Sequence, residues 1–336
     1  MTAAVRSPAI VIIGRNEGDR LKCCLASLPQ NVDRIYVDSG STDGSQSHAR
    51  SLGVTVIDLD REKGFTAARA RNAGLSVIRQ GAHVPEFVQM VDGDCELDAY
   101  WLGTAAAALE AEPGLAAVFG RRRERFPEHS LYNRQCDEEW NVPLGYVASC
   151  GGDAMFRLGA LSAVGDYRPD LIAGEEPDLC LRLAQQGWSI KRIDAEMTIH
   201  DVALIHFSQW WRRSRRAGYA YTEHVWRNGI RSLPNWRRQV ASILLWGGVI
   251  PIVAGIFLLV GLAIPLLLLV GLGLLLIYPV QLCRIAWRNR TGGTLAFGYA
   301  ALIVVGKFAE AGGAVRFLIW YLRRSAPQII EYKSAL

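Results

Sequence analysis

The most constraining feature of this chain is a long stretch without any ionisable side chain. From Val240 to Cys283 the sequence contains no Asp, Glu, Lys, Arg or His. A helix crosses the hydrocarbon layer of a membrane in roughly 20 residues, so two spans fit here with a tight turn near Pro265. The alternative is a helical hairpin buried in a soluble domain, which we disfavour because soluble helices keep a polar face. We predict a transmembrane helical hairpin over residues 236–290.

Basic residues flank this predicted hairpin on both sides. Arg237 and Arg238 precede it, and Arg284, Arg288 and Arg290 follow it. The positive-inside rule then places both ends of the hairpin, and the region before it, on the cytoplasmic side. The apolar run Ala9–Ile13 is too short to form the core of a signal peptide. We therefore expect a multi-pass protein of the inner (cytoplasmic) membrane.

Charge and cysteine content give no sign of a nucleic-acid-binding protein or of a zinc site. The net charge is only +5, and much of the basic excess lies in "RRRER" (121–125) and "WWRRSRR" (210–216). Beside a membrane segment such clusters favour lipid headgroups or phosphate groups as partners, and we expect no nucleic acid. The seven cysteines form no CxxC pair and no Cys/His cluster with zinc spacing, so we expect free thiols.

Short apolar runs alternate with helical patterns from about Ile10 to Leu183, which predicts an α/β domain with a parallel sheet. The expected strands are 9–14, 33–40, 54–60 and 86–94, and the expected helices are 16–29, 41–53 and 65–81. Because the carboxyl ends of parallel strands meet at one sheet edge, polar residues that follow these strands are candidate ligand contacts.

The remaining segments complete a prediction of three parts. Residues 185–235, rich in Trp, Arg and His, are expected to be an interfacial helical part of a catalytic domain covering 1–235. Lys307, Glu310 and Arg316 interrupt the apolar pattern of the last segment, 291–336. We interpret that segment as interfacial or re-entrant, with a third membrane span as the alternative, followed by a tail.

Acidic residues follow two of the expected strands. In "MVDGDCEL" (90–97), Asp92 and Asp94 place two hard oxygen ligands near one another, which suits Mg²⁺ or Mn²⁺ bound together with phosphate oxygens. Asp38, in "VDSGSTDGS", offers an acceptor for a base or ribose, and a turn-forming or capping role is its alternative. Cys95 gains no role, since a hard cation has little use for a thiol.

Six motifs occur in order over the first half of the chain. They are "VIIGRNEG" (11–18), "VDSGSTDGS" (37–45), "ARARNAG" (68–74), "MVDGDCEL" (90–97), "GGDAMFR" (151–157) and "GEEPDLCLRL" (174–183). In this series the chain resembles the inverting nucleotide-sugar glycosyltransferases of family 2. The resemblance implies the A-type glycosyltransferase fold, a Rossmann-like and mostly parallel α/β domain, followed here by α-helical membrane segments.

The resemblance also implies roles for individual residues on the nucleotide-sugar side. Arg15, Asn16 and Glu17 would line the nucleotide pocket, Asp38 would bind the base, Arg71 and Asn72 would border the nucleotide or sugar, Asp92 would face the ribose or sugar, Asp94 would ligate the metal, and Asp153 would lie near the sugar or acceptor. For Arg71 the alternative is helix packing, and for Asp153 it is turn capping.

"GEEPDLCLRL" resembles the family's acidic acceptor motif. Inverting transfer needs a carboxylate that takes a proton from the attacking acceptor hydroxyl. Glu176 occupies the position where the family usually has Asp, so it is the candidate catalytic base, with Glu175 as the second candidate. The alternative is that this acidic run only caps the helix that follows.

Histidine and arginine residues downstream add further candidates. His200 would complete a metal site with Asp94 and Asp92, because neutral imidazole suits Mn²⁺, whereas a structural role is equally open and His206 is a weaker candidate. Gln209 and Arg212 match the Gln-x-x-Arg-Trp form of polymerising synthases, but Arg213 replaces its Trp. Arg212 and Arg213 would bind diphosphate oxygens, or anchor the chain at the membrane interface.

Together these features predict a membrane-anchored, metal-dependent glycosyltransferase that uses Mn²⁺ or Mg²⁺. It would transfer a single sugar, with inversion, from a nucleotide-diphosphate sugar to a lipid or lipid-linked saccharide, in exopolysaccharide or cell-envelope glycan synthesis. The departure from Gln-x-x-Arg-Trp and the few spans disfavour a processive polymerase. The alternatives are an inactive membrane-bound nucleotide-binding scaffold and a metal-dependent nucleotidyltransferase.

Overall fold

A computed structural model describes residues 7–60, 64–289 and 295–323, and the chain divides into two compact units. Unit 1 consists of Met1–Pro127 and Cys136–Ala203. Unit 2 consists of Glu128–Gln135 and Leu204–Leu336, and the helix α5 (Leu131–Glu139) contributes residues to both units. Each unit is described by itself below.

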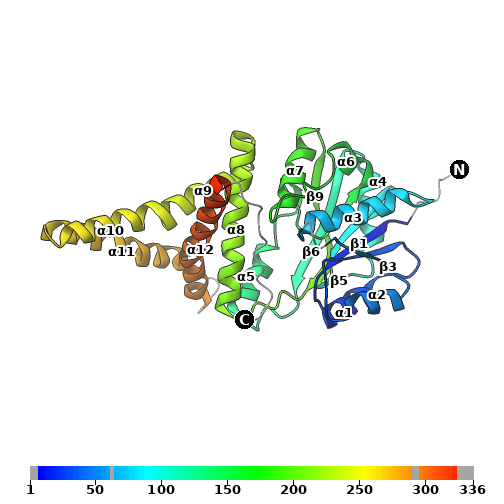
Figure 1. Cartoon of the computed structure of the whole chain (residues 1–336), viewed down its shortest axis with the longest axis horizontal. Helices are drawn as coiled ribbons and strands as arrows, with labels where there is room; N and C mark the ends of the chain where they lie inside the picture. The colour runs from blue at the N-terminus through cyan, green and yellow to red at the C-terminus, as the bar shows by residue number, and fades with distance from the viewer. Residues whose placement is uncertain (1–6, 61–63, 290–294, 324–336) are drawn as a thin grey trace. The chain divides into compact units, whose positions relative to one another are not determined.

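Unit 1 is a nine-stranded sheet with helices connecting its strands (Figure 1). The strand order is β3-β2-β1-β4-β8-β6-β9-β5, and β7 pairs with β9. The strands are β1 (Ala9–Gly14), β2 (Arg34–Asp38), β3 (Thr55–Asp58), β4 (Phe87–Asp92), β5 (Cys95–Leu97), β6 (Leu115–Glu124), β7 (Gly145–Val147), β8 (Ala154–Arg157) and β9 (Ser189–His200). The other helices are α1 (Asp19–Ser27), α2 (Ser45–Ser51), α3 (Ala67–Gln80), α4 (Trp101–Ala111), α6 (Leu158–Ala163) and α7 (Glu175–Gln185).

The first half of the sheet is parallel, as the sequence predicts. Strands β3, β2, β1 and β4 pair in parallel, and Ile10, Val11 and Ile12 of β1 are fully buried. An apolar run buried on both faces is typical of a parallel strand covered by helices. The register aligns Gly14 with Asp38 and Ile13 with Asp92, so the carboxyl ends of β2 and β4 lie on either side of β1 at one sheet edge.

The second half of the sheet is mixed. Strand β8 is antiparallel to both β4 and β6, β9 is parallel to β6, and β5 and β7 are antiparallel to β9. The sheet is mostly parallel, as the predicted fold class requires, but a parallel direction for β8 is wrong. A short buried apolar run has the same pattern in either direction, so periodicity does not determine which way the strand points.

The helical part of the chain begins later than expected. Residues 189–200, assigned above to an interfacial helical part that starts at 185, form β9 of unit 1 instead. The burial of β9 alternates over much of its length, and its last residue, His200, is buried beside unit 1 carboxylates. The first long helix after it is α8, which starts at Phe207.

Unit 2 is helical in the part of the chain that is described. It contains α8 (Phe207–Asn228), the short 3₁₀ turn η1 (Gly229–Arg231), α9 (Pro234–Leu244), the π-helical turn η2 (Leu245–Val249), α10 (Ile250–Gly261), α11 (Pro265–Arg288) and α12 (Leu295–Arg323). Residues 290–294 and 324–336, at the ends of the predicted last segment, lie outside the described residues.

Two helices of unit 2 are long and apolar enough to cross a membrane. They are the continuous helix Pro234–Gly261 and helix α11, and they extend side by side in Figure 1. Only 11% and 6% of their most apolar windows are buried, whereas a core helix of a soluble domain would be mostly buried. The predicted hairpin thus corresponds to two helices with a turn just before Pro265, and their exposed apolar surface favours a membrane hairpin over the buried one. That these helices cross a membrane stays a prediction.

Helices α8 and α12 approach one another closely through glycines. A Cβ added to Gly218 would lie 2.0 Å from the carbonyl oxygen of Glu310, and one added to Gly313 would lie 2.0 Å from that of Arg215. Small residues at such crossings let two helix backbones touch. Helix α12 is one continuous helix of 29 residues.

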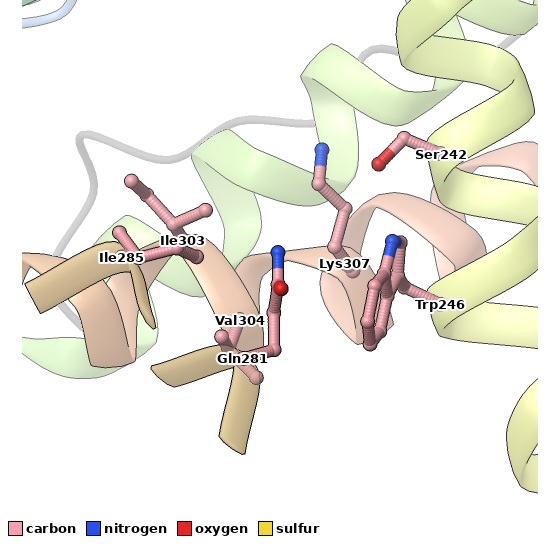
Figure 2. Close-up of a pocket in the computed structure, with 7 residues that line it drawn as sticks. All are labelled: Ser242, Trp246, Gln281, Ile285, Ile303, Val304 and Lys307. Atoms are coloured by element: carbon pink, nitrogen blue, oxygen red, sulfur yellow. The ribbon is translucent and has the colours of Figure 1, made fainter. Parts of the chain in front are cut away.

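A charged pair and a small cavity lie among the helices of unit 2. The Lys307 amine donates to Glu310 at 2.7 Å and to Gln239 at 2.8 Å, so the charges that interrupt this apolar segment are partnered. Beside it is a cavity of about 50 Å³. Figure 2 shows the polar ends of Lys307, Gln281 and Ser242 directed to the same side of this cavity.

Candidate active site

A buried guanidinium joins three of the predicted site carboxylates in unit 1. Arg71, on α3, is only 2% exposed. Its Nη2 donates to Asp92 at 2.9 Å, while Nη1 lies 3.1 Å from Glu175 and 2.8 Å from Glu176. The guanidinium also lies over the ring of Tyr167, 5.5 Å from its centroid. Because one positive charge faces three carboxylates, the cluster favours a further cation.

A second guanidinium, which the sequence analysis did not assign to the site, partly supplies that charge. Arg122 lies 2.6 Å from Asp153 and 3.2 Å from Asp92. Asp153 also accepts from the backbone N–H of Asp92 at 2.9 Å and from the Thr198 hydroxyl at 3.0 Å. Burial would raise the pKa of Asp92, but Arg71 and Arg122 outweigh it and hold that pKa below its usual value.

The basic run 121–125 lies in and just after strand β6, and its arginines have separate acidic partners. Arg121 pairs with Asp137, Arg123 pairs with Glu196, and the register of β6 with β9 shifts between Arg121 and Arg122. Such an irregularity interrupts the alternation of side chains along a strand, so the sequence pattern does not show which face Arg122 occupies.

Close packing holds these charged groups together at Gly152, in the predicted motif "GGDAMFR". A Cβ on Gly152 would lie 2.6 Å from Arg71 Nη2 and 2.8 Å from Asp92 Oδ2. Only a residue without a side chain can occupy this position while both groups stay in place. At Gly151, by contrast, a Cβ would meet nothing within 4 Å.

Asp94 and His200 form a separate buried pair. His200 Nε2 lies 2.7 Å from Asp94 Oδ2, and the two side chains are 6% and 1% exposed. Among the described residues, two groups of three side chains have potential ligand atoms within 4.8 Å of one another. One group is Asp94, Cys95 and His200, and the other is Asp92, Cys95 and Asp153.

Comparisons with known proteins agree on one family. The model of "Glycosyl transferase family 2" matches residues 9–150, and that of "Glycosyl transferase family group 2" matches residues 139–280. Together the two models cover residues 9–280, and the predicted resemblance to family 2 glycosyltransferases is confirmed. Among curated relatives of this glycosyltransferase is the succinoglycan biosynthesis protein ExoA of Rhizobium meliloti, 24% identical over 272 residues, which are 73% of this chain and 81% of that protein.

A solved structure has the same fold as this glycosyltransferase. It is the mannosyltransferase PcManGT from Pyrobaculum calidifontis, in complex with GDP-Man and Mn²⁺. The TM-score is 0.57 at 19% identity, and the match covers 93% of this chain and 87% of that one. The predicted fold class, an A-type α/β domain followed by apolar helices, is confirmed.

The residues of this glycosyltransferase fit a divalent metal at Asp94 and His200. A carboxylate oxygen and an imidazole nitrogen are ligands that suit Mn²⁺, and both face one another in a buried position. Burial and the nearby Asp153 raise the pKa of the Cys95 thiol well above its usual value, so a thiolate ligand is disfavoured. Asp92 belongs to the other group, where two arginines hold it.

Glu176 has the acid–base property that a catalytic base requires. Burial, followed by the charge of Glu175, raises the pKa of Glu176 to about 7, although Arg71 acts in the opposite direction. A general base works best when its pKa lies near the operating pH. Both glutamates lie in the first turn of α7, where acidic residues can cap a helix, and both also contact Arg71. The predicted catalytic position and the alternative capping position therefore coincide.

The predicted base-binding residue, Asp38, is fully buried and forms four hydrogen bonds inside the protein. Its carboxylate accepts from the Tyr36 hydroxyl, the backbone N–H groups of Gly40 and Ser41, and the Gln46 amide, all at 2.7–2.9 Å. These contacts are those of an Asx-type turn, the alternative role. A direct contact between Asp38 and a base stays a prediction.

The neighbouring predicted residues shape the same sheet edge. Asn16, at φ 54°, accepts from the Thr42 N–H and donates its own N–H to Ser41, which ties the β1 turn to the β2 turn. Glu17 is buried and pairs with Arg20 at 2.9 Å.

Arg15 is exposed, whereas the side chain of Asn72 is hydrogen-bonded inside unit 1. The exposed Arg15 guanidinium lies over the Phe65 ring, 5.3 Å from its centroid. Asn72 exchanges two hydrogen bonds with the backbone of Tyr167, and so its amide holds the loop before α7. Their contacts with a nucleotide or sugar stay predictions.

Gln209, Arg212 and Arg213 lie on α8, in unit 2. The Gln209 side chain accepts from the backbone N–H groups of Ile205 and His206, so it caps the start of this helix. Arg212 Nε donates to the carbonyl of Ser208 at 3.3 Å. The predicted diphosphate contacts of these residues stay predictions.

Proposed function

We propose that this glycosyltransferase transfers a single sugar, with inversion, from a nucleotide-diphosphate sugar to a lipid or lipid-linked saccharide. The placement of Glu176 carries the proposal. Its carboxylate is 14% exposed and lies 2.8 Å from Arg71, in a cluster that also contains Asp92, and so it is suited to accept a proton from an acceptor hydroxyl. Its raised pKa, about 7, supports this role at neutral pH.

Other residues of the site would bind the nucleotide-sugar donor. Asp92, oriented by Arg71 and Arg122, would accept hydrogen bonds from the ribose or sugar hydroxyls. Asp94 and His200 would hold Mn²⁺ or Mg²⁺, and the bound ion would offset the charge that develops on the departing diphosphate. The Mn²⁺ and GDP-Man bound to the mannosyltransferase of the same fold support this division of roles.

The acceptor class follows from unit 2 and from the relatives. Two helices long and apolar enough to cross a membrane would keep the enzyme at the bilayer surface, where a lipid-linked acceptor is found. Their basic flanks support a catalytic domain, residues 1–235, that faces the cytoplasm from the inner membrane. The name of the Rhizobium meliloti relative, a succinoglycan biosynthesis protein, supports a role in exopolysaccharide or cell-envelope synthesis.

Radiolabel transfer tests the proposal. Membranes containing the full chain are incubated with a panel of labelled nucleotide sugars and with Mn²⁺ or Mg²⁺, and label is measured in the lipid extract. We expect one donor to label the lipid fraction, release of a nucleoside diphosphate, and loss of both with Glu176→Gln and Asp94→Ala. Glu110→Gln, which changes an exposed carboxylate on α4, is the matched control and should behave as wild type.

The products also separate the alternatives. A nucleotidyltransferase would release pyrophosphate, and an inactive scaffold would bind nucleotide without consuming any donor. If no donor is hydrolysed or transferred, and the Asp94→Ala membranes are indistinguishable from wild type, the proposed activity is wrong. The anomeric configuration of the product, determined by NMR, tests inversion.

A further inference from the structure

The His200 ring lacks the hydrogen bond that usually fixes a metal-ligating histidine. Such a histidine normally donates its second ring N–H to a carboxylate or carbonyl, which sets the ring orientation. In His200, Nε2 faces Asp94, whereas Nδ1 is buried and has no hydrogen-bond partner in the part of the chain that the structure describes. One polar contact at Nε2 leaves the tilt of the ring undetermined.

The aromatic ring of Trp140 packs against the imidazole ring of His200. The Trp140 ring centroid is 4.7 Å from that of His200, with the two planes inclined by 37°. The backbone of His200 is already fixed, because this residue ends β9 in register with both Cys95 and Glu124. Packing against the Trp140 ring therefore restricts the side-chain torsions of His200.

The same tryptophan also contacts the other half of the site. The Arg122 guanidinium lies over the Trp140 ring, 5.3 Å from its centroid, and Arg122 holds Asp92 and Asp153. Trp140 follows the end of α5 and is half-buried. A single side chain thus touches the imidazole of the Asp94–His200 pair and the arginine of the Asp92–Asp153 group.

We infer that Trp140 is a positioning residue for the metal site: its ring orients His200 in place of the absent Nδ1 hydrogen bond and keeps Arg122 beside Asp92. This inference rests on the proposed metal role of Asp94 and His200. Trp140 itself contributes no ligand. Removal of the Trp140 ring should lower the affinity for Mn²⁺, and this effect should be measurable in the absence of sugar transfer.

Mn²⁺ binding to the full chain in detergent tests the inference without turnover. The EPR signal of free Mn²⁺ is titrated with protein, alone and with GDP or UDP present. We expect Trp140→Leu to weaken Mn²⁺ binding about tenfold or more, as for other supports of metal ligands. Trp140→Phe keeps an aromatic face and should stay within about threefold of wild type.

Controls separate positioning from a general loss of structure. Trp188→Leu removes another half-buried tryptophan of unit 1 and should leave Mn²⁺ affinity unchanged, even if the melting temperature falls. Equal Mn²⁺ affinity in Trp140→Leu and Trp140→Phe would overturn the positioning role. If His200→Ala binds Mn²⁺ as wild type, or wild type binds none, the proposed metal site itself fails, and the inference fails with it.

Discussion

Replacing Glu175 with glutamine should lower the pKa of the catalytic base without removing that base. Both glutamates contact the same atom, Nη1 of Arg71, at 3.1 and 2.8 Å. Two like charges held about 6 Å apart or less repel by about 3 kcal/mol at an effective dielectric constant near 20, which is roughly two pK units. Burial is the larger cause of the raised pKa of Glu176 and remains in the variant. Because Arg71 also offsets part of the repulsion, we expect a downward shift on the order of one unit.

The assay is the pH dependence of kcat/KM for sugar transfer by the full chain. The wild-type rate should rise with pH through about 7, as Glu176 loses its proton. In Glu175→Gln this rise of kcat/KM should occur at lower pH, and the maximal value at high pH should be largely retained. In Glu176→Gln the rate should fall by about 10²- to 10⁴-fold at every pH. Glu110→Gln removes an exposed carboxylate and should leave the pH of this rise unchanged.

The opposite pattern would refute the assignment of the base. If Glu175→Gln abolishes transfer while Glu176→Gln retains it, the base is Glu175. If both variants transfer sugar and kcat/KM rises at the same pH as in wild type, neither glutamate is the base. An upward shift in Glu175→Gln would contradict the assumed repulsion, because removal of a neighbouring negative charge should favour the ionised form of Glu176.

Three further variants probe other contacts. Asp94→Ala should lower transfer by about 100-fold or more and weaken Mn²⁺ binding, whereas unchanged Mn²⁺ titrations would exclude it as a ligand. Gly152→Ala should reduce transfer because its Cβ would lie 2.6 Å from a guanidinium nitrogen, while Gly151→Ala, with open space around it, should resemble wild type in the same assay. In unit 2, Gly313→Ala should destabilise the chain by about 1–3 kcal/mol through overpacking. Gly312→Ala, whose nearest new contact is 3.7 Å away, should raise the melting temperature slightly, and the reverse order of the two would contradict the close helix crossing.

The sequence identified most of the groups in the site but not how they are connected. Asp92 was a candidate because an acidic residue that follows a buried strand is visible as a pattern, and the resemblance to family 2 added Asp153, Glu175 and Glu176. That one buried arginine contacts three of them is not visible, since those contacts join residues up to 105 positions apart and depend on how α3 and α7 pack.

Arg122 shows a different limit of sequence reasoning. A cluster of arginines suggested phosphate or lipid partners, but in the folded sheet Arg121, Arg122 and Arg123 pair with different carboxylates, those of Asp137, Asp153 and Glu196. Trp140 had no sequence signal at all. Its contacts with Arg122 and His200 exist only because β6 and β9 are adjacent in the sheet.

By itself the sequence determined the class of structure at each end of the chain. A long apolar stretch without charges predicts a membrane hairpin, and short apolar runs that end in acidic residues predict the parallel half of an α/β sheet, because both patterns are local in the sequence. The direction of β8, the strand at 189–200 and the pairing of charges were decided only by tertiary structure. Those features depend on which distant segments become neighbours. Two arginines hold the pKa of Asp92 below its usual value, whereas burial and the charge of Glu175 raise the pKa of Glu176 to about 7.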